Sequence, residues 1–133
     1  MQRLIPTRVL LVDDHPAVRQ GLRDLLASEG SVLVVGEAGS ASEAEVQVTE
    51  LEPDVVIMDI GLPDMNGLDA TRRLQEARPQ VKILVYTMHE GTEYVTEARR
   101  AGARGYVLKR APFAELVRAL RAIRRGESAF PVS

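Results

Sequence analysis

Five short apolar runs alternate along the chain with longer segments in which apolar residues recur every three or four positions. The runs are rich in Val, Ile and Leu and nearly unbroken, as is typical of parallel strands covered on both faces, although short runs also fit buried helix. The intervening segments have the spacing of amphipathic helices. We therefore expect strands at 8–12, 32–35, 55–58, 82–86 and 105–108.

The helical segments have recognisable faces and ends. The first places four apolar residues on one face, namely Val18, Leu22, Leu25 and Leu26, and the last carries a stripe from Phe113 to Ile123. Pro16 suits a first helical turn, and Ser40 with Glu43 reads as a capping box. Three glycines fall where left-handed C-caps are common: Gly30, Gly102 and Gly126.

A fivefold strand–helix alternation predicts an α/β fold. Parallel strands joined by right-handed crossovers place helices on both faces of an open, doubly wound sheet. At 133 residues the chain has the length of one domain. In such sheets ligands bind outside the carboxyl ends of the strands.

The composition limits which binding partners and which cellular location we expect for this chain. The net charge of −2 gives no reason to expect direct binding to nucleic acid or to an anionic membrane. The chain has no cysteine, which excludes a disulfide framework and a thiolate metal site. No apolar run has the length of a membrane span, and residues 1–6 are too short and polar for a signal peptide. We expect a cytoplasmic protein.

Polar residues of different chemical type follow four of the five runs. Asp13 and Asp14 follow the first, Asp59 the third, Thr87 the fourth and Lys109 the fifth. The carboxyl edge of a parallel sheet would bring these side chains together. Three carboxylates, a hydroxyl and an ammonium group suit a divalent cation and a phosphoryl group, with Asp59 as the nucleophile.

Each residue also has a simpler interpretation. Asp14 before Pro16 is a candidate helix N-cap, and Asp59 a candidate turn residue. Thr87 taken alone is an ordinary strand residue, and Lys109 an ordinary surface lysine. Three further groups have simple readings as well: Tyr106 as a core residue, His89 as a solvated loop residue, and Arg118, Arg121, Arg124 and Arg125 as a solvated helix face.

The motifs resemble a known family. The segments LLVDDHPAVRQGL, DVVIMDIGLPDMNGLD, VYTMHE and GARGYVLKRAPFAELVRAL are similar to those of receiver domains of bacterial two-component response regulators, from about Thr7 to Gly126. The His-Pro after the acidic pair, the TMHE segment and Gly-Tyr-Val-Leu-Lys resemble the NarL/FixJ-like branch. This resemblance implies a flavodoxin-like sheet with strand order 2-1-3-4-5, an order that the chemotaxis member of the superfamily exemplifies.

The resemblance also implies a role for each matched residue. Asp59 would accept the phosphoryl group, assisted by Thr87 and Lys109. The expected Mg²⁺ ligands are Asp13, Asp14, Asp59 and the backbone carbonyl of Gly61. Thr87 and Tyr106 would form the switch, and Gly61 and His89 would modulate the lifetime of the phosphoryl group.

As a member of this family the chain would be a signalling switch and not a conventional enzyme. It would take its phosphoryl group from a sensor histidine kinase and form a homodimer when phosphorylated. We expect a leader at 1–6, the receiver at 7–126 and the start of a linker at 127–133. DNA would be bound only through a C-terminal domain outside this chain. We interpret the chain itself as a receiver cut from a longer regulator, with a stand-alone receiver as the alternative.

Two departures and three competing classes qualify this interpretation. Lys109 is followed by Arg110, whereas many receivers have a cis-proline there, and Leu62-Pro63 replaces the usual Met-Pro. A haloacid-dehalogenase-like phosphatase would need a carboxylate at Gly61 and a cap insertion. A flavin or nucleotide binder would need a phosphate loop after the first strand, where Asp13 and Asp14 would repel the phosphate. A degenerate receiver would lack part of the residue set.

Overall fold

Five parallel strands, each followed by a helix, form one sheet in the computed structural model, which describes residues 5–131. The strand order is β2-β1-β3-β4-β5, which confirms the predicted fold class and order. The strands are β1 (Thr7–Val12), β2 (Val32–Ala38), β3 (Val55–Met58), β4 (Lys82–Thr87) and β5 (Gly105–Leu108). The helices are α1 (Pro16–Ala27), α2 (Ala41–Leu51), α3 (Gly67–Ala77), α4 (Thr92–Ala101) and α5 (Phe113–Arg124).

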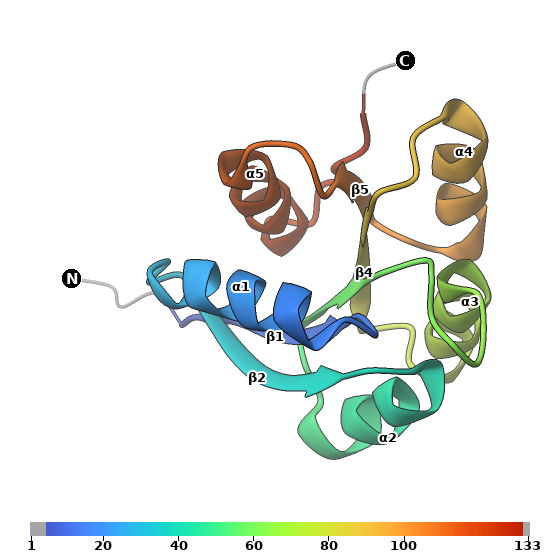
Figure 1. Ribbon diagram of the computed structural model, residues 1–133, viewed down its shortest axis with the longest axis horizontal. Coiled ribbons are helices and arrows are strands. Elements are labelled where there is room, and N and C mark those ends of the chain that lie inside the picture. The colour runs from blue at the N-terminus through green and yellow to red at the C-terminus, as the bar shows by residue number, and fades with distance from the viewer. Residues whose placement is uncertain (1–4, 132–133) are drawn as a thin grey trace.

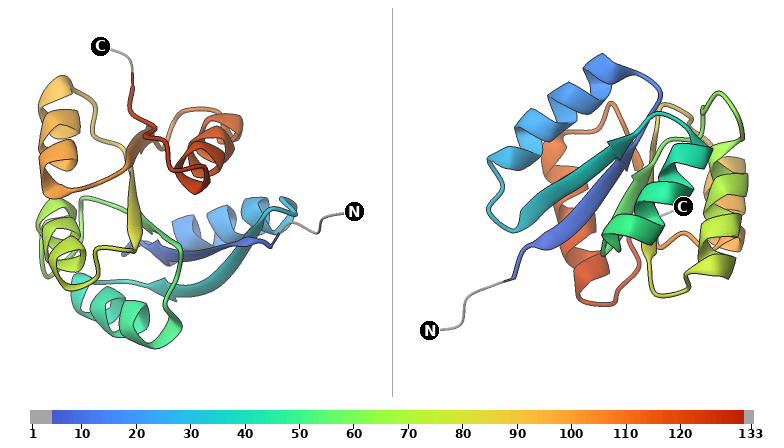
Figure 2. Two further views of the ribbon diagram at one scale, coloured as in Figure 1. Left: turned by 180° about the vertical axis from the view of Figure 1, so that it is seen from behind. Right: turned by 90° about the horizontal axis from the view of Figure 1, so that it is seen from below.

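Helices cover both faces of the sheet. Helices α1 and α5 lie on one side and α2, α3 and α4 on the other (Figure 1), as the views from behind and from below also show (Figure 2). The apolar core is divided accordingly into a cluster under α1 and α5 and two clusters under the opposite helices. The central strands are buried on both faces, which explains their unbroken apolar runs. Within residues 5–131, no helix combines the length and the apolar character of a membrane span.

The predicted strands agree with the structure except at the second. Strands β3 and β5 have the predicted bounds, and β1 and β4 are each one residue longer. Strand β2 continues three residues beyond its prediction, to Ala38. The pairing with β1 shifts within it, because Val9 pairs with Val34 whereas Leu10 pairs with Gly36. Val35 is thus an extra residue, a β-bulge, and the polar segment after it remains part of the sheet.

The predicted helix ends are mostly confirmed. Pro16 starts α1, and the Ser40 hydroxyl accepts a hydrogen bond from the Glu43 amide at 3.2 Å. Gly102 and Gly126 have φ of 101° and 86°, as left-handed caps require. The prediction for Gly30 was wrong: α1 ends earlier, with Ser28 as its right-handed cap. The predicted face of α1 was also partly wrong, since only two of its four residues are buried, Leu22 and Leu26, while Val18 and Leu25 are exposed.

The segment after α5 returns to the sheet. The Ala129 amide donates to the Arg104 carbonyl at 2.8 Å, and the Ala129 carbonyl accepts from the Tyr106 amide at 3.0 Å. Phe130 packs beside the cluster that contains Tyr106, and the guanidinium of Arg99 lies 4.1 Å from the centre of its ring. Residues 127–131 of the predicted linker therefore lie against the domain. Residues 132–133 of the linker and 1–4 of the leader fall outside the described residues.

The loop between β3 and α3 is held by one close backbone approach. The Gly67 amide donates to the Ile60 carbonyl at 2.7 Å, and the Asn66 side chain caps α3 by accepting from the Leu68 amide. A Cβ atom at Gly67 would lie 1.9 Å from the Asp59 carbonyl oxygen. Only glycine allows this approach, which fixes how the chain leaves Asp59.

We predict that Gly67→Ala destabilises the protein by at least about 2 kcal/mol, because backbone must move to relieve the overlap. Intrinsic helix propensity alone would give the opposite sign, since Ala is favoured over Gly by roughly 1 kcal/mol in a helix. Gly61→Ala is the matched control in the same loop, because nothing lies within 4 Å of a Cβ there. Urea unfolding of both variants measures the difference, and equal stabilities would contradict the prediction.

Candidate functional site

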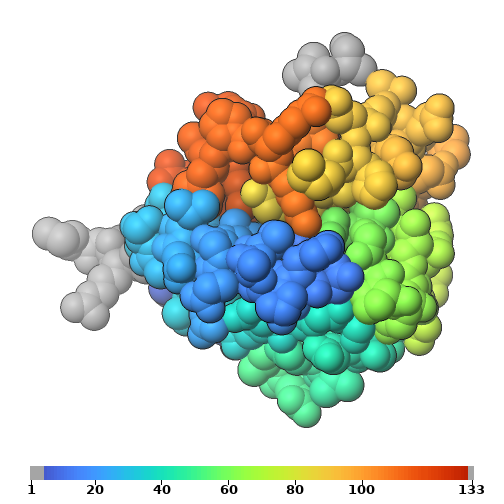
Figure 3. All heavy atoms as spheres, viewed as in Figure 1, coloured from blue at the N-terminus to red at the C-terminus, as the bar shows by residue number. Residues whose placement is uncertain are grey.

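The carboxyl edge of the sheet gathers the polar residues that follow the strands. Asp13 and Asp59 directly extend the strand ladders, since the Asp13 amide donates to Ala38 and the Asp59 amide to Val12, each at 3.0 Å. In the space-filling view the start of α1 (blue), the segment after β3 (green) and the segment after β5 (orange) meet on one face of the molecule (Figure 3). The predicted convergence of side chains at this edge is therefore observed for the acidic residues and Lys109.

Three carboxylates form the base of the site. One ligand atom from each of Asp13, Asp14, His15 and Asp59 lies within 4.8 Å of the others. Asp13 and Asp59 are buried. Within the described residues the buried Oδ1 of Asp14 has no hydrogen-bond donor. His15 Nδ1 lies 2.9 Å away, but the contact lacks the geometry of a hydrogen bond.

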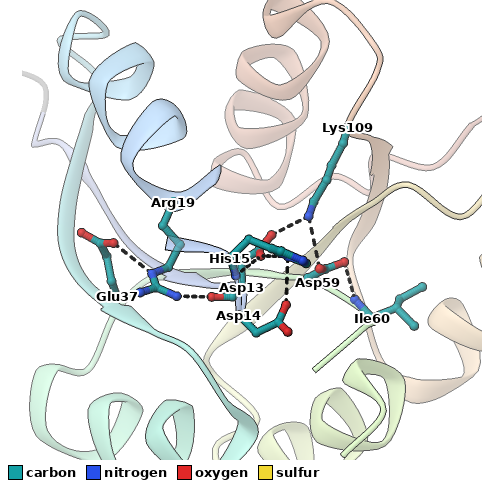
Figure 4. A network of polar contacts seen from close by, with 8 residues as sticks. All are labelled: Asp13, Asp14, His15, Arg19, Glu37, Asp59, Ile60 and Lys109. Carbon is teal, nitrogen blue, oxygen red and sulfur yellow. Dashed lines mark hydrogen bonds and ion pairs between the residues drawn. The ribbon is translucent and has the colours of Figure 1, made fainter. Parts of the chain in front are cut away.

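Lys109 joins two of the carboxylates. Its Nζ donates to Asp13 Oδ2 at 2.5 Å and to Asp59 Oδ2 at 3.1 Å (Figure 4). Burial by itself would lower the pKa of Lys109, but the two carboxylates outweigh it and raise that pKa. Burial would likewise raise the pKa of Asp13, but hydrogen bonds from Lys109 and the His15 amide, with the charge of Lys109, lower it. The ammonium group is therefore held charged between the two anions.

Backbone amides fix the remaining oxygens of the buried carboxylates. Asp59 Oδ1 accepts from the Ile60 amide at 2.8 Å, and Asp13 Oδ1 accepts from the His15 amide at 2.9 Å. The residue that caps α1 is His15, without a side-chain hydrogen bond. The simpler interpretation of Asp14 as the N-cap is therefore wrong, and its carboxylate is left facing the site.

Three of the other predicted site residues, Thr87, Tyr106 and His89, meet at the loop after β4. The buried Thr87 hydroxyl accepts from the His89 amide at 3.2 Å, and the Tyr106 hydroxyl donates to the His89 carbonyl at 2.5 Å. Burial raises the pKa of Tyr106 to about 12. The His89 ring lies 4.8 Å from that of Tyr94. Gly61, exposed in the β3–α3 loop, forms a bridge with Asn66. Thr87 and Tyr106 thus hold the same loop residue from two strands.

The donor set suits a hard divalent cation. Three carboxylates and one ammonium group leave a formal charge of −3 + 1 = −2 at the site. Carboxylate oxygens are the ligands that Mg²⁺ prefers, and it commonly binds through one or two of them together with water and phosphate oxygens. The Asp14 oxygen without a donor is the kind of atom that a cation would satisfy.

Two residues at the site were not predicted from the sequence. Arg19 on α1 donates from Nη1 to the Asp13 backbone carbonyl and from Nε to Glu37 Oε1 on β2 (Figure 4). The signal was a charged residue, Glu37, within the polar continuation of an apolar strand, and an arginine one turn into the helix that follows the acidic pair.

Comparisons with known proteins give the chain a family. Residues 9–121 match the response regulator receiver domain. The chain is 43% identical over 121 residues to the DNA-binding transcriptional activator DevR/DosR of Mycobacterium tuberculosis, covering 91% of this chain and 56% of that protein. It thus spans little more than half the length of such curated relatives.

Solved structures agree. A two-component response regulator of the LuxR family from Aurantimonas sp. SI85-9A1 has a TM-score of 0.90 at 43% identity, covering 94% of this chain and 89% of that one. The isolated receiver domain of RcsB from Salmonella enterica serovar Typhimurium, solved with the phosphomimetic BeF₃⁻, has a TM-score of 0.88 at 27% identity, covering 96% and 94%. The chain therefore belongs to the receiver domains of two-component response regulators, and the relatives indicate the NarL/FixJ type.

Proposed function

We propose that this receiver accepts a phosphoryl group from a sensor histidine kinase onto Asp59. Receiver domains are signalling switches and not conventional enzymes, and we infer that this one assists its own phosphorylation and dephosphorylation. The observation that carries the proposal is the Lys109 ammonium group between Asp13 and Asp59, beside an Asp14 oxygen that lacks a donor. This set offers a nucleophile, a fixed positive charge and an acidic pair within one buried edge.

The contacts support a separate task for each side chain. The Ile60 amide and Lys109 hold the two oxygens of Asp59, so the nucleophile has one orientation. Lys109 would move from the carboxylates toward the phosphoryl oxygens and offset their charge. Asp13, Asp14, Asp59 and the Gly61 carbonyl would hold Mg²⁺. When bound, that ion supplies the charge that offsets repulsion between carboxylate and phosphoryl group.

Thr87 and Tyr106 would transmit the change. Both bind the backbone of His89, so a hydroxyl drawn from the His89 amide toward a phosphoryl oxygen would release one of the two contacts that hold the loop before α4. Tyr106 is already buried, so its ring would respond by repacking in the cluster it shares with Val85 and Ala98. A phosphoryl group would thus bias the α4–β5–α5 face between two states.

Gly61 and His89 would modulate the lifetime of the acyl phosphate. Gly61 is exposed and lacks a side chain, which leaves this side of the site open to water. His89 is exposed in the loop after Thr87, and its ring lies against Tyr94. Both residues are exposed in loops that follow strand ends at the carboxyl edge of the sheet, where water would reach the acyl phosphate.

The output would be dimerisation and control of an attached domain. The outer faces of α4 and α5 carry exposed charges, Glu93, Glu97, Arg118 and Arg121, suited to pairing between two copies. We propose a receiver at 7–126, preceded by a leader at 1–6 and followed by a linker from 127 onward. DNA would be bound through a C-terminal effector domain, consistent with the DNA-binding relative of which the chain covers 56%. The cytoplasm, where histidine kinases act on such domains, is the proposed location.

The proposal predicts a gain of one phosphoryl group in intact mass when the protein is incubated with acetyl phosphate and Mg²⁺. Omission of Mg²⁺ and the variant Asp59→Asn should each abolish the gain, since the first removes the charge that offsets repulsion and the second the nucleophile. Asp64→Asn is the matched control, an aspartate in the same loop that caps α2 through the Ala41 and Ser42 amides. Label retained by Asp59→Asn would place the acceptor elsewhere.

We predict that removal of the Lys109 ammonium group changes the pKa of the neighbouring Asp13 carboxyl. In Lys109→Ala the pKa of Asp13 should rise from its lowered value, because burial then acts without the hydrogen bond and charge of Lys109. In the wild type the lowered pKa contributes stability above about pH 4, which is lost as pH falls through the folded value. Arg110→Ala is the control, an exposed neighbour paired with Glu90. Carboxyl-carbon NMR titration measures the shift, and an unchanged Asp13 pKa would refute this account of the charge balance.

Dimerisation gives a third test. With beryllofluoride and Mg²⁺ the sedimenting species should approach twice the 14.6 kDa monomer mass, because the altered α4–β5–α5 face would pair two copies. Asp59→Asn should remain monomeric under the same conditions. Equal sedimentation of the wild type with and without beryllofluoride would count against dimerisation through this domain.

A further inference from the structure

The Asp13 backbone carbonyl has an unusual donor. The pairing of β1 with its neighbouring strands ends at Val12. The Asp13 carbonyl is therefore the first one after β1 that accepts no hydrogen bond from a neighbouring strand. The guanidinium of Arg19, from the second turn of α1, donates to it and thereby closes the β1–α1 loop on itself. Only 18% of the Arg19 side chain is exposed. The contact fixes the plane of the peptide between Asp13 and Asp14.

That peptide plane sets the direction of Asp14. The carboxylate of Asp13 is held by Lys109 and the His15 amide, and that of Asp59 by Lys109 and the Ile60 amide. Asp14 Oδ1, in contrast, is buried without a hydrogen-bond donor in the described residues. Its one ion-pair partner in the described residues is the exposed His15 ring, whose Nδ1 lies 2.9 Å away in the same loop. The placement of the Asp14 carboxylate therefore depends on the backbone of this loop, and that backbone depends on the arginine.

A second contact holds the arginine in place. Arg19 Nε donates to Glu37 Oε1 at 3.1 Å, and the same carboxylate accepts from the exposed Arg23 at 2.6 Å (Figure 4 shows the Arg19 contact). Glu37 is itself fixed, since its backbone carbonyl accepts from Gln47 at 2.5 Å. The guanidinium thus bridges β2 and the end of β1 with two different nitrogens.

The bulge in β2 is what brings Glu37 to this face. Glu37 pairs with Leu11, whose side chain lies in the cluster under α1 and α5. Without the extra residue Val35 the register would slip by one, and Glu37 would pair with Val12, which faces α2 and α3. The irregularity therefore turns Glu37 toward Arg19 and away from the opposite helices.

We propose that Arg19, anchored by Glu37, is a positioning residue for divalent-cation binding, acting through the Asp13–Asp14 peptide to aim Asp14 into the site. The inference rests on the proposed function, since it concerns the same cation. Partners one shell away from metal ligands commonly contribute about tenfold or more to affinity by fixing ligand orientation.

Because Arg19 is positively charged, the direction in which its replacement changes Mg²⁺ affinity distinguishes a positioning role from a purely electrostatic one. A positive group close to the acidic pair opposes a second cation, so simple removal of its charge would tighten Mg²⁺ binding. Loss of positioning would weaken binding instead. The two explanations thus predict opposite changes in the same measured constant.

The experiment is a Mg²⁺ titration of the 133-residue chain, monitored by NMR at the Asp13, Asp14 and Asp59 amides, with urea unfolding in the absence of Mg²⁺ alongside. We expect Arg19→Gln to raise the Mg²⁺ dissociation constant about tenfold. Arg19→Lys, which keeps the charge but lacks the planar fork whose separate nitrogens reach Asp13 and Glu37, should recover part of the loss. Arg23→Gln, which loses an ion pair to the same Glu37 without touching Asp13, should bind as the wild type does.

Glu37→Asp provides a second route that leaves Arg19 and the net charge in place but draws the carboxylate back from the Arg19 guanidinium. It should weaken Mg²⁺ binding in the same direction, even should Arg19→Gln fail to fold. Unchanged or tighter binding by the folded Arg19 and Glu37 variants, with only a loss of stability in urea, would overturn the proposal. A wild type that shows no Mg²⁺-dependent shift at these amides would overturn the cation site itself, a failure distinguishable from that of Arg19 alone.

Discussion

The ion pairs of Lys109 hold the functional edge of this receiver together. Strands β1 and β3 each end in a buried carboxylate, and two such anions in close proximity would repel one another. One ammonium group from the far side of β4 contacts both. The loop after β5 is thereby tied to the centre of the sheet, and a phosphoryl group that drew Lys109 away would disturb both ends of that tie.

The fold was predictable where one physical rule acts alone. Strands covered on both faces read as continuous apolar runs, so β3 and β5 were placed to the residue. Strand β2 lies at an edge and contains a bulge, and its continuation through Glu37 has no apolar signature. The first helix was read as more buried than it is, since Val18 and Leu25 on its predicted apolar face are exposed. Both wrong predictions, the end of β2 and the buried face of α1, concern features that are set by packing in the folded protein and not by the local sequence pattern.

The site was predictable as a set of residues but not as a set of contacts. The topology of a parallel sheet requires residues such as Asp13, Asp59 and Lys109 to share one edge, whatever their conformations. The sequence did not indicate that His15 would cap α1, that Asp14 would lack a donor, or that Arg19 would take the Asp13 carbonyl. Those outcomes depend on peptide orientation in a short loop, which no periodicity encodes.

The most direct test of the account is to identify the phosphorylated residue chemically. An acyl phosphate is reduced by borohydride to the corresponding alcohol, which converts aspartate to homoserine. After incubation with acetyl phosphate and Mg²⁺, peptide sequencing by mass spectrometry should find homoserine at position 59. Homoserine at Asp13, Asp14 or another aspartate instead of at position 59 would contradict the assignment of Asp59 as the acceptor.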